Sequence, residues 1–175
     1  FLGNSDGSFA QAESQPWSKS ATADDVGATF FDFNGDENID LYISAGGVEG
    51  DFDNRIYLSD GEGRFERHSF ANPSHVSTVV TAADYDQDGR TDLYVGGSSI
   101  PGKWPNWTWS KLLRNTTEGL EPHHDKTDDP TPLEGRVMAA RWADVDADGD
   151  LDLVTATDWG AIKVALNREG KLTDA

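Results

Sequence analysis

The 175-residue sequence contains no cysteine, so disulfides are excluded and thiols say nothing about the redox compartment. Basic residues are scarce: 14 Lys and Arg stand against 32 Asp and Glu, which gives a formal net charge of −18. We expect no binding to nucleic acid or to anionic membrane surfaces, because both would repel so acidic a chain. No apolar run approaches the length that spans a membrane, so we also expect no membrane insertion.

Three segments concentrate short acidic residues on what we interpret as tight loops. Each segment places oxygen-bearing side chains at loop positions 1, 3, 5 and 9 and then continues into an apolar stretch. A hard cation such as Ca²⁺ takes about six to eight oxygen ligands. Without a cation, carboxylates this close would repel one another by roughly 1–4 kcal/mol per pair. We therefore expect three calcium loops, which span residues 32–40 (loop 1), 84–92 (loop 2) and 144–152 (loop 3).

A second marker, a strand–turn–strand motif around Asp-Gly, Gly or Asn, recurs in step with these loops. Its four copies cover residues 1–9, 56–65, 112–120 and 164–172. The closing apolar residues Phe9, Phe65, Leu120 and Leu172 are 56, 55 and 52 residues apart, and the first Asp of each loop recurs after 52 and 60 residues. Two independent markers with one period indicate a tandem repeat.

Each repeat carries four short strand signals. A strand of small residues precedes each acidic loop, at 26–31, 79–83 and 137–142, and an aliphatic strand follows it, at 39–43, 93–95 and 151–154. The hairpin supplies the third and fourth strands. Four antiparallel strands in about 50 residues, with Gly and Ala in the first, are typical of a propeller blade. No segment shows a sustained helical period, which disfavours an alternating α/β fold.

The sequence thus predicts an all-β fold, a partial β-propeller of about three four-stranded antiparallel blades. We expect residues 1–20 to form the end hairpin of a preceding blade, 21–71 the first full blade, 72–125 the second and 126–175 the third. Propellers generally close with about 4–8 blades. The chain opens at Phe1 inside an apolar pattern, so we expect a processed or truncated piece of a longer ring. Association of copies is the alternative way to supply the remaining blades.

The motif Asp-x-[Asp/Asn]-x-Asp-Gly-x-x-Asp-Leu, followed by a Leu-x-Asn-x-x-Gly hairpin, resembles the FG-GAP/VCBS repeats of integrin α-like β-propellers. The resemblance covers nearly the whole chain, and residues 92–164 are most similar in pattern to bacterial secreted FG-GAP/VCBS proteins. It implies a usually seven-bladed propeller with calcium between the first two strands of a blade. It also implies an extracellular, cell-surface or periplasmic location and a role in binding or cell adhesion.

Carried over position by position, the resemblance implies calcium ligands in all three loops. Side-chain oxygens come from positions 1, 3, 5 and 9 and a backbone carbonyl from position 7, which gives Asp32, Asn34, Asp36, Asn38 and Asp40; Asp84, Asp86, Asp88, Arg90 and Asp92; and Asp144, Asp146, Asp148, Asp150 and Asp152. Position 6 usually adopts a left-handed backbone, which costs a non-glycine residue roughly 1 kcal/mol. Loop 1 has Glu37 there and the neutral Asn34 at position 3. We expect loop 1 to be the weakest site.

The acidic loops also allow other interpretations. An EF-hand or dockerin needs a bidentate acid at position 12, where this chain has Ile43, Val95 and Thr155. The loops can also be turns without a metal, since Asp, Asn and Gly favour turns, although three copies in register argue against this. Mg²⁺ remains an alternative, but Ca²⁺ is preferred because Mg²⁺ demands stricter octahedral geometry.

The aromatic segment 100–109 places three tryptophans, Trp104, Trp107 and Trp109, within six positions. They are candidate partner-binding residues, as a stacking platform for sugar rings or an anchor for a protein. The competing interpretation is that they cover the blade edge and pack against a neighbour. We expect Trp142 and Trp159 to fill spaces between blades, and His123-His124-Asp125 to lie in a solvated loop rather than to bind a metal.

No nucleophile motif or phosphate loop appears in the sequence. We therefore expect a non-enzymatic, calcium-binding module that recognises a protein or glycan through its loops. The alternative is the scaffold of a calcium-assisted polysaccharide lyase or related enzyme, in which the metal keeps a position open for substrate.

Overall fold

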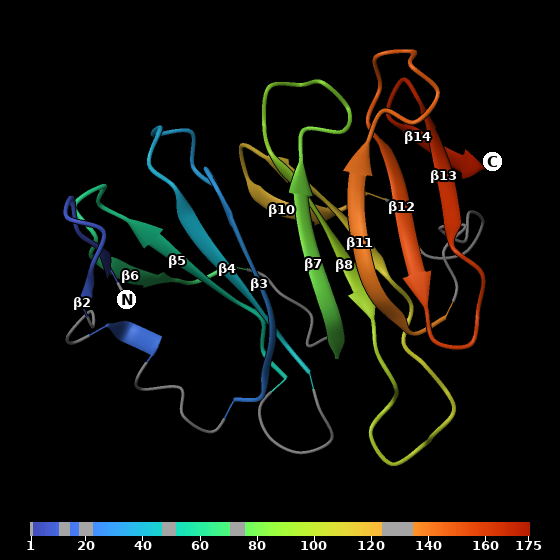
Figure 1. Cartoon of the computed structure of the whole chain (residues 1–175), viewed down its shortest axis with the longest axis horizontal. Helices are drawn as coiled ribbons and strands as arrows, with labels where there is room; N and C mark the ends of the chain where they lie inside the picture. The colour runs from blue at the N-terminus through green and yellow to red at the C-terminus, as the bar shows by residue number, and fades with distance from the viewer. Residues whose placement is uncertain (1, 11–14, 18–22, 47–51, 71–75, 124–134) are drawn as a thin grey trace.

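The computed structural model of the chain describes residues 2–10, 15–17, 23–46, 52–70, 76–123 and 135–175 (Figure 1). Within these ranges the secondary structure is built on fourteen β-strands. They are β1 (Leu2–Gly3), β2 (Phe9–Ala10), β3 (Asp25–Phe31), β4 (Asp40–Ala45), β5 (Arg55–Ser59), β6 (Phe65–His68), β7 (Ser77–Ala83), β8 (Asp92–Gly97), β9 (Lys111–Thr116), β10 (Gly119–Pro122), β11 (Val137–Ala143), β12 (Asp152–Thr157), β13 (Lys163–Arg168) and β14 (Lys171–Asp174).

Strands that follow one another in the chain pair antiparallel into three four-stranded sheets. Sheet 1 has the order β3-β4-β5-β6, sheet 2 β7-β8-β9-β10 and sheet 3 β11-β12-β13-β14. Each sheet contains one of the predicted sets of four strands, so the all-β fold of four-stranded antiparallel blades is confirmed. The repeat extends to a detail: the first strand of every sheet carries one register shift near its start, at Asp25/Gly27, Ser77/Val79 and Val137/Ala139.

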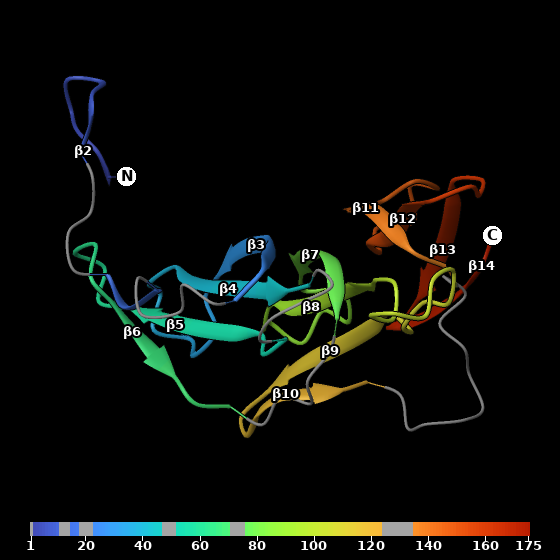
Figure 2. The same cartoon turned by 90° about the horizontal axis from the view of Figure 1, so that it is seen from below.

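The first strands β3, β7 and β11 lie side by side, and the sheets spread from them as an open array (Figures 1 and 2). Small residues permit this close approach. A Cβ on Gly27 would lie 2.7 Å from Ser44 Oγ and 3.4 Å from the backbone nitrogen of Val80 in the next sheet. A Cβ on Gly96 of β8 would lie 2.9 Å from the side chain of Val137. Gly27 of a first strand and Gly96 of a second strand therefore lie where a larger side chain would clash with a neighbour.

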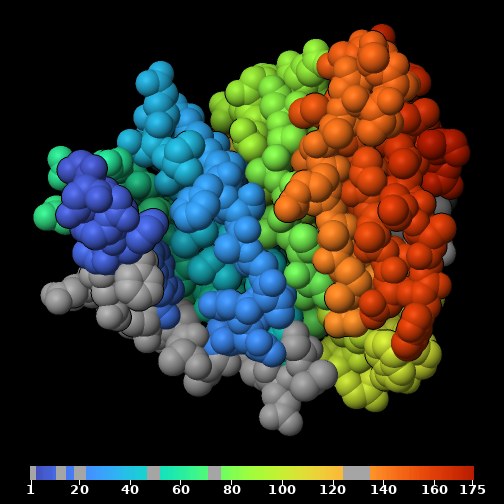
Figure 3. Space-filling model, viewed as in Figure 1, coloured from blue at the N-terminus to red at the C-terminus, as the bar shows by residue number. Residues whose placement is uncertain are grey.

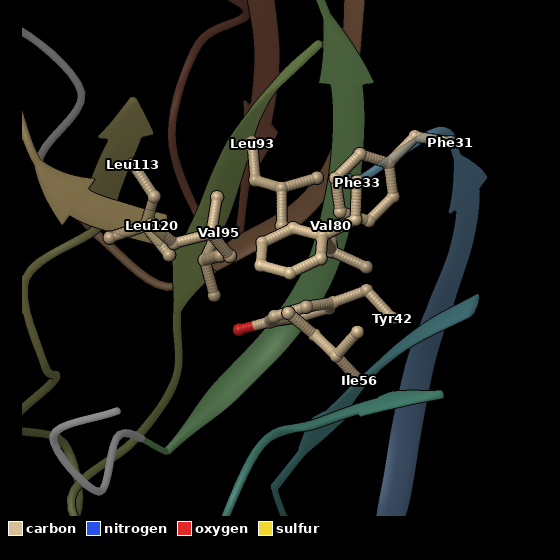
Figure 4. Packing of buried hydrophobic residues seen from close by; sticks show 9 residues of the cluster. All are labelled: Phe31, Phe33, Tyr42, Ile56, Val80, Leu93, Val95, Leu113 and Leu120. Carbon is tan, nitrogen blue, oxygen red and sulfur yellow. The ribbon is translucent and has the colours of Figure 1, made fainter. Parts of the chain in front are cut away.

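Two apolar cores lie between the sheets. In the first, Tyr42 and Ile56 of sheet 1 pack against Leu93 and Val95 of sheet 2 (Figure 4). In the second, Tyr94 and Leu112 of sheet 2 pack with residues of sheet 3 that include Val137 and Leu153. Alternate residues of β8 thus face opposite neighbours, because side chains of a strand alternate between the two faces of the sheet. Each core forms only when two consecutive sheets meet.

The outer face of sheet 1 has a smaller cluster, in which Leu41, Ile43 and Tyr57 are buried and Trp17 packs against them. The ring of Trp17 meets that of Tyr57 edge-on, with 5.6 Å between the centroids. The hairpin of β1 and β2 stands away from the three sheets (Figure 2). Among the residues that the structure describes, no helix has the length and apolar character needed to cross a membrane.

Candidate metal centres

The three acidic loops occupy equivalent places in the three sheets. Each connects the first strand to the second, as β3 to β4, β7 to β8 and β11 to β12, and all three lie at the same end of the molecule, uppermost in Figure 1. The tips of loops 1 and 3 project at the upper edge of the space-filling view (Figure 3). The repeat therefore gathers the acidic residues of the motif at one end.

The first aspartate of each loop organises the turn by accepting backbone hydrogen bonds. Asp32 accepts from the N–H groups of Gly35 at 2.8 Å and Glu37 at 2.9 Å. Asp84 accepts from Asp88 and Gly89 at 3.1 and 2.9 Å. Asp144 does the same with Asp148 and Gly149, at 3.2 and 3.1 Å. Short carboxylate side chains that bond to their own turn explain why aspartate holds this position.

Two residues in each loop adopt a left-handed backbone. At position 6, Glu37 has a φ of 68°, and Gly89 and Gly149 have φ values of 86° and 98°. The predicted left-handed position is therefore confirmed, including the unfavourable Glu37.

Position 4 is also left-handed, which the sequence analysis missed, and its occupants are Gly35, Gln87 and Ala147, with φ values of 79°, 57° and 62°. Each loop thus holds one glycine and one non-glycine in this conformation. Backbone strain therefore gives no reason to rank loop 1 below the others, since Gly35 offsets Glu37. Only the neutral Asn34 and the geometry of the carboxylates support that ranking.

The aspartates at position 9 are fully buried: Asp40, Asp92 and Asp152 are each 0% exposed. Asp40 accepts from the N–H of Phe33 in its own loop at 3.0 Å and from the N–H of Ser59 in β5 at 2.8 Å. Asp152 makes the same two bonds, with Val145 and Asn167, both at 2.8 Å. Each of these carboxylates therefore ties the acidic loop to the third strand of its sheet.

In loop 2, Asp92 Oδ1 accepts from the N–H of Asn115 at 2.8 Å. Asp92 Oδ2 is buried and has no hydrogen bond of normal geometry among the described residues. Burial is the largest cause that raises the pKa of Asp92 to about 7, and the nearby carboxylates of Asp86 and Asp88 raise it further, against the opposing Asn115 amide. Burial also raises the pKa of Asp40. The backbone N–H of Tyr85 faces Asp92 and, like the Asn115 amide, opposes the rise in its pKa. A buried carboxylate beside other carboxylates fits a site for a cation.

Loops 2 and 3 each bring three acidic groups to one centre. One ligand atom from each of Asp84, Asp86 and Asp88 lies within 4.8 Å of the others, and Asp144, Asp146 and Asp152 form the second such group. These are the two groups of this kind among the described residues. Both offer only oxygen donors, which suit a hard cation such as Ca²⁺ or Mg²⁺. The residues present therefore fit a divalent ion.

The remaining predicted ligands lie in the same three loops but outside these two groups. They are Asp32, Asn34, Asp36, Asn38 and Asp40 of loop 1, Arg90 and Asp92 of loop 2, and Asp148 and Asp150 of loop 3. At position 7, the N–H groups of Asn38, Arg90 and Asp150 donate to the aspartate at position 5 of the same loop, at 2.8, 2.9 and 2.9 Å. A role of their carbonyls as ligands stays a prediction.

A side-chain nitrogen donor lies against the acid at position 5 of every loop, and in loops 2 and 3 it also lies against the acid at position 3. In loop 1, Asn34 Nδ2 donates to Asp36 Oδ2 at 2.9 Å and is the main cause that lowers the pKa of Asp36. In loops 2 and 3 the donors are arginines of the third strand, Arg114 and Arg168. The sequence analysis missed both arginines, because their reach to the loops depends on how the third strand lies against the acidic turn.

The tryptophans of the 100–109 segment are exposed: Trp104 by 57%, Trp107 by 45% and Trp109 by 60%. They lie in the connection from β8 to β9, at the end opposite to the acidic loops (Figure 1). The ring of Trp104 meets that of Trp159, from the connection between β12 and β13, with centroids 5.1 Å apart and planes at 76°. Aromatic side chains from two neighbouring sheets therefore form one exposed pair.

Trp159 corrects the expectation that it fills a space between blades, because it is 85% exposed. It sits in a turn with a φ of 54°, and that backbone places the ring beside Trp104 rather than in the core. Trp142 meets the expectation, since it packs at the second core and stacks on Tyr85 with centroids 5.7 Å apart. His123 contacts Tyr85 edge-on at 5.4 Å, whereas His124 and Asp125 lie outside the described residues.

The three four-stranded antiparallel sheets, each with an acidic turn between its first two strands, are consistent with propeller blades and place the chain among the all-β repeat proteins with acidic loops. Residues 32–95 match the family model described as FG-GAP-like repeat. The match begins at the first aspartate of loop 1 and ends in β8, after loop 2. This chain therefore contains an FG-GAP-like repeat, and the resemblance is confirmed over these residues. A comparison with curated proteins finds no match.

Proposed function

We propose that this chain is a calcium-binding β-propeller module that acts as an extracellular, cell-surface or periplasmic binding or adhesion domain. The observation that carries the proposal is the gathering of acidic groups with only oxygen donors within 4.8 Å, in loop 2 of the FG-GAP-like repeat and in loop 3 of the next sheet. When bound, the ion neutralises the clustered carboxylates and draws each acidic turn into one arrangement. The chain's own groups supply the rest, since the position-1 aspartates hold the turn and the position-9 aspartates tie it to the third strand.

Three sites are proposed, with loop 1 the weakest, because Asn34 replaces an acid there and its carboxylates are not among the gathered groups. Calcium suits the proposed location, since extracellular modules bind it with dissociation constants of about 0.1–1 mM. Each site filled at 100 times its dissociation constant adds about 2.7 kcal/mol to the free energy of unfolding. Calcium would then raise the free energy of unfolding at the millimolar concentrations outside a cell, and would not do so at the much lower concentrations inside one.

The ligand surface of this proposal is the exposed tryptophan end, remote from the acidic loops. Trp104 and Trp159 present aromatic faces to solvent from two neighbouring sheets, and Trp107 and Trp109 lie in the same connection as Trp104. Such faces stack on sugar rings or anchor a protein partner. The proposed role is binding and not catalysis, with the metal serving to stabilise the sheets that carry this surface.

The experiment is a calcium titration with thermal melting of wild type and of Asp84→Ala, Asp144→Ala and Asp32→Ala. We expect calcium to raise the melting temperature of wild type, and the first two variants each to lose one site's share of the gain, about 2.7 kcal/mol at 100 times the dissociation constant. Asp32→Ala is expected to lose least. An unchanged melting temperature of wild type in millimolar calcium would overturn the metal role, and a larger loss in Asp32→Ala would overturn the ranking of the loops.

A further inference from the structure

In sheet 2 an arginine of the third strand lies over the acidic loop of the same sheet. Arg114 Nε is 2.7 Å from Asp86 Oδ2, and Arg114 Nη2 is 3.0 Å from Asp88 Oδ2. One guanidinium thus bridges the carboxylates at positions 3 and 5. Both carboxylates belong to the acidic group gathered in loop 2.

Sheet 3 makes the same bridge from a different place in the chain. Arg168 Nη2 is 2.6 Å from Asp146 Oδ2, and Arg168 Nη1 is 2.5 Å from Asp148 Oδ2. Arg114 comes one residue before the buried Asn115 of its strand, whereas Arg168 comes one residue after the equivalent Asn167. The same two loop positions are bridged from two different strand positions. The charge of the loop, and not a fixed residue pattern in the strand, is therefore what the two contacts share.

Sheet 1 has no arginine at either strand position. Ser59 aligns with the two asparagines, so the aligned neighbours are Leu58 and Asp60. Loop 1 is also the loop in which position 3 is neutral: Asn34 replaces the acid and donates to Asp36 at 2.9 Å. Within this one chain, the arginine is present where position 3 is an acid and absent where it is an amide. The carboxylate at position 3 and the arginine of the third strand therefore occur together.

We propose that Arg114 and Arg168 are built-in counter-ions of loops 2 and 3, which stabilise the acidic turn before a divalent ion binds and weaken the binding of that ion. This inference rests on the proposed function, since it concerns the affinity of the proposed calcium sites. The arginine charge lies against two ligand carboxylates and therefore close to the place of the ion. Like charges about 6 Å apart in a water-like medium repel enough to lower the affinity for a divalent ion by about tenfold.

The opposite effect, in which the arginine improves affinity by orienting the ligands, is the competing possibility. The loop geometry disfavours it, because backbone N–H groups already orient the acids. Asp84 accepts from Asp88 and Gly89, and Asp88 Oδ1 accepts from Arg90 at 2.9 Å. Removing a guanidinium that is roughly half exposed leaves these bonds in place. The lost positive charge is then the larger change.

The test measures calcium affinity by calorimetry and melting in EDTA for wild type, Arg114→Gln and Arg168→Gln. Arg67→Gln is the matched control, because Arg67 is an exposed arginine of β6 with no ion pair to another described residue. We expect each of the two variants to bind calcium about tenfold more tightly at one site. Both are also expected to melt at a lower temperature in EDTA, and Arg67→Gln to change neither quantity. The double variant Asp84→Asn/Arg114→Gln should lose the tighter calcium-binding step seen for Arg114→Gln, which would assign that step to loop 2.

Unchanged or weaker calcium binding in both variants, with wild type binding normally, overturns this inference and leaves the proposed function standing. A wild type that binds no calcium overturns the proposed function and, with it, the claim about affinity. The melting temperatures in EDTA then still test the claim that the arginines stabilise the acidic turns without metal. A loss in both arginine variants, beyond that of Arg67→Gln, supports counter-ions of the metal-free loops, and no loss overturns them.

Discussion

The aspartates at position 9 combine two roles in one buried carboxylate. Asp40 and Asp152 each accept one hydrogen bond from their loop and one from the third strand, and Asp92 accepts from the third strand through Oδ1. The carboxylate is therefore structural as well as a proposed ligand. For Asp40 and Asp92, burial raises the pKa of the carboxyl group, so the ionised form is costly until a cation or sufficient N–H donors compensate it.

This burial predicts an unusual pH dependence in the absence of metal. The pKa of Asp92 is raised to about 7, above the ordinary value of 3.8, so the folded state binds the proton more tightly than the unfolded state does. The stability that protonation of Asp92 contributes is present at low pH and is lost as the pH rises toward and through 7. In EDTA, wild type should gain about 1 kcal/mol relative to Asp92→Asn between pH 8 and pH 6. Urea unfolding at the two pH values measures the difference.

Saturating calcium supplies the control for this prediction. The ion requires ionised ligands, so the gain of wild type at pH 6 should disappear or reverse when calcium is present. Asp92→Asn keeps a side-chain oxygen for the N–H of Asn115, so it should fold. Parallel pH profiles of wild type and variant in EDTA would contradict the assignment to Asp92.

At the scale of the elements, buried asparagines join sheets 2 and 3 to the acidic loop of the sheet before each of them. Asn115 Nδ2 of β9 donates to the carbonyl oxygen of Phe33 in loop 1 at 3.0 Å, and Asn167 Nδ2 of β13 donates to that of Tyr85 in loop 2 at 2.7 Å. The residues of each pair are 82 positions apart. The backbone N–H of the same asparagines bonds to Asp92 and Asp152. Acidic loops of neighbouring sheets are therefore linked through one residue.

Replacement of this asparagine should loosen two sheets at once. Asn115→Ala leaves the buried carbonyl of Phe33 without its donor and opens a small cavity, which should cost about 2 kcal/mol of unfolding free energy. Asn106→Ala is the control, because that side chain is exposed and should change stability by less than about 0.5 kcal/mol. Chemical denaturation measures both. Equal stability of the two variants would show that the link between the sheets contributes nothing.

At the scale of the whole molecule, charge and aromatic surface are separated to opposite ends (Figure 1). The turns between first and second strands carry the acidic loops, and the connections between second and third strands carry Trp104 and Trp159. Antiparallel strands place these two sets of connections at opposite ends of each sheet. A ligand at the tryptophans therefore does not meet the highest density of negative charge.

This arrangement predicts that binding and stability separate on mutation. Trp104→Ala and Trp159→Ala should each change the unfolding free energy by less than about 0.5 kcal/mol, because both rings are largely exposed. If the ligand is a glycan, each should weaken binding of neutral oligosaccharides such as cellohexaose by about fivefold, since an aromatic contact is worth on the order of 1 kcal/mol. Tryptophan fluorescence and calorimetry measure the binding.

Ile162→Ala is the control, because Ile162 is exposed by 71% in the same connection as Trp159 but has no aromatic face. Equal binding by wild type and both tryptophan variants would remove these residues from the ligand surface. If wild type binds none of the neutral oligosaccharides tested, a protein is the ligand class that the proposal retains.

The sequence by itself determined the features that arise from neighbouring residues. Alternation along short strands and Gly-rich or Asp-rich turns predicted three sheets of four strands, and the structure confirms them. The acidic positions of the three loops could also be predicted, including the left-handed backbone at Glu37. These features are local, because hydrogen bonds within a turn and the pleat of a strand depend on residues only a few positions apart.

Only the tertiary structure decided which groups meet from distant parts of the chain. It placed Arg114 and Arg168 on the acidic loops, Asn115 on loop 1, and Trp159 beside Trp104 rather than in a core. Each of these contacts depends on the angle and register at which strands or whole sheets pack against one another. Those are set by the summed burial of many side chains in the two cores, and no single stretch of sequence carries that sum.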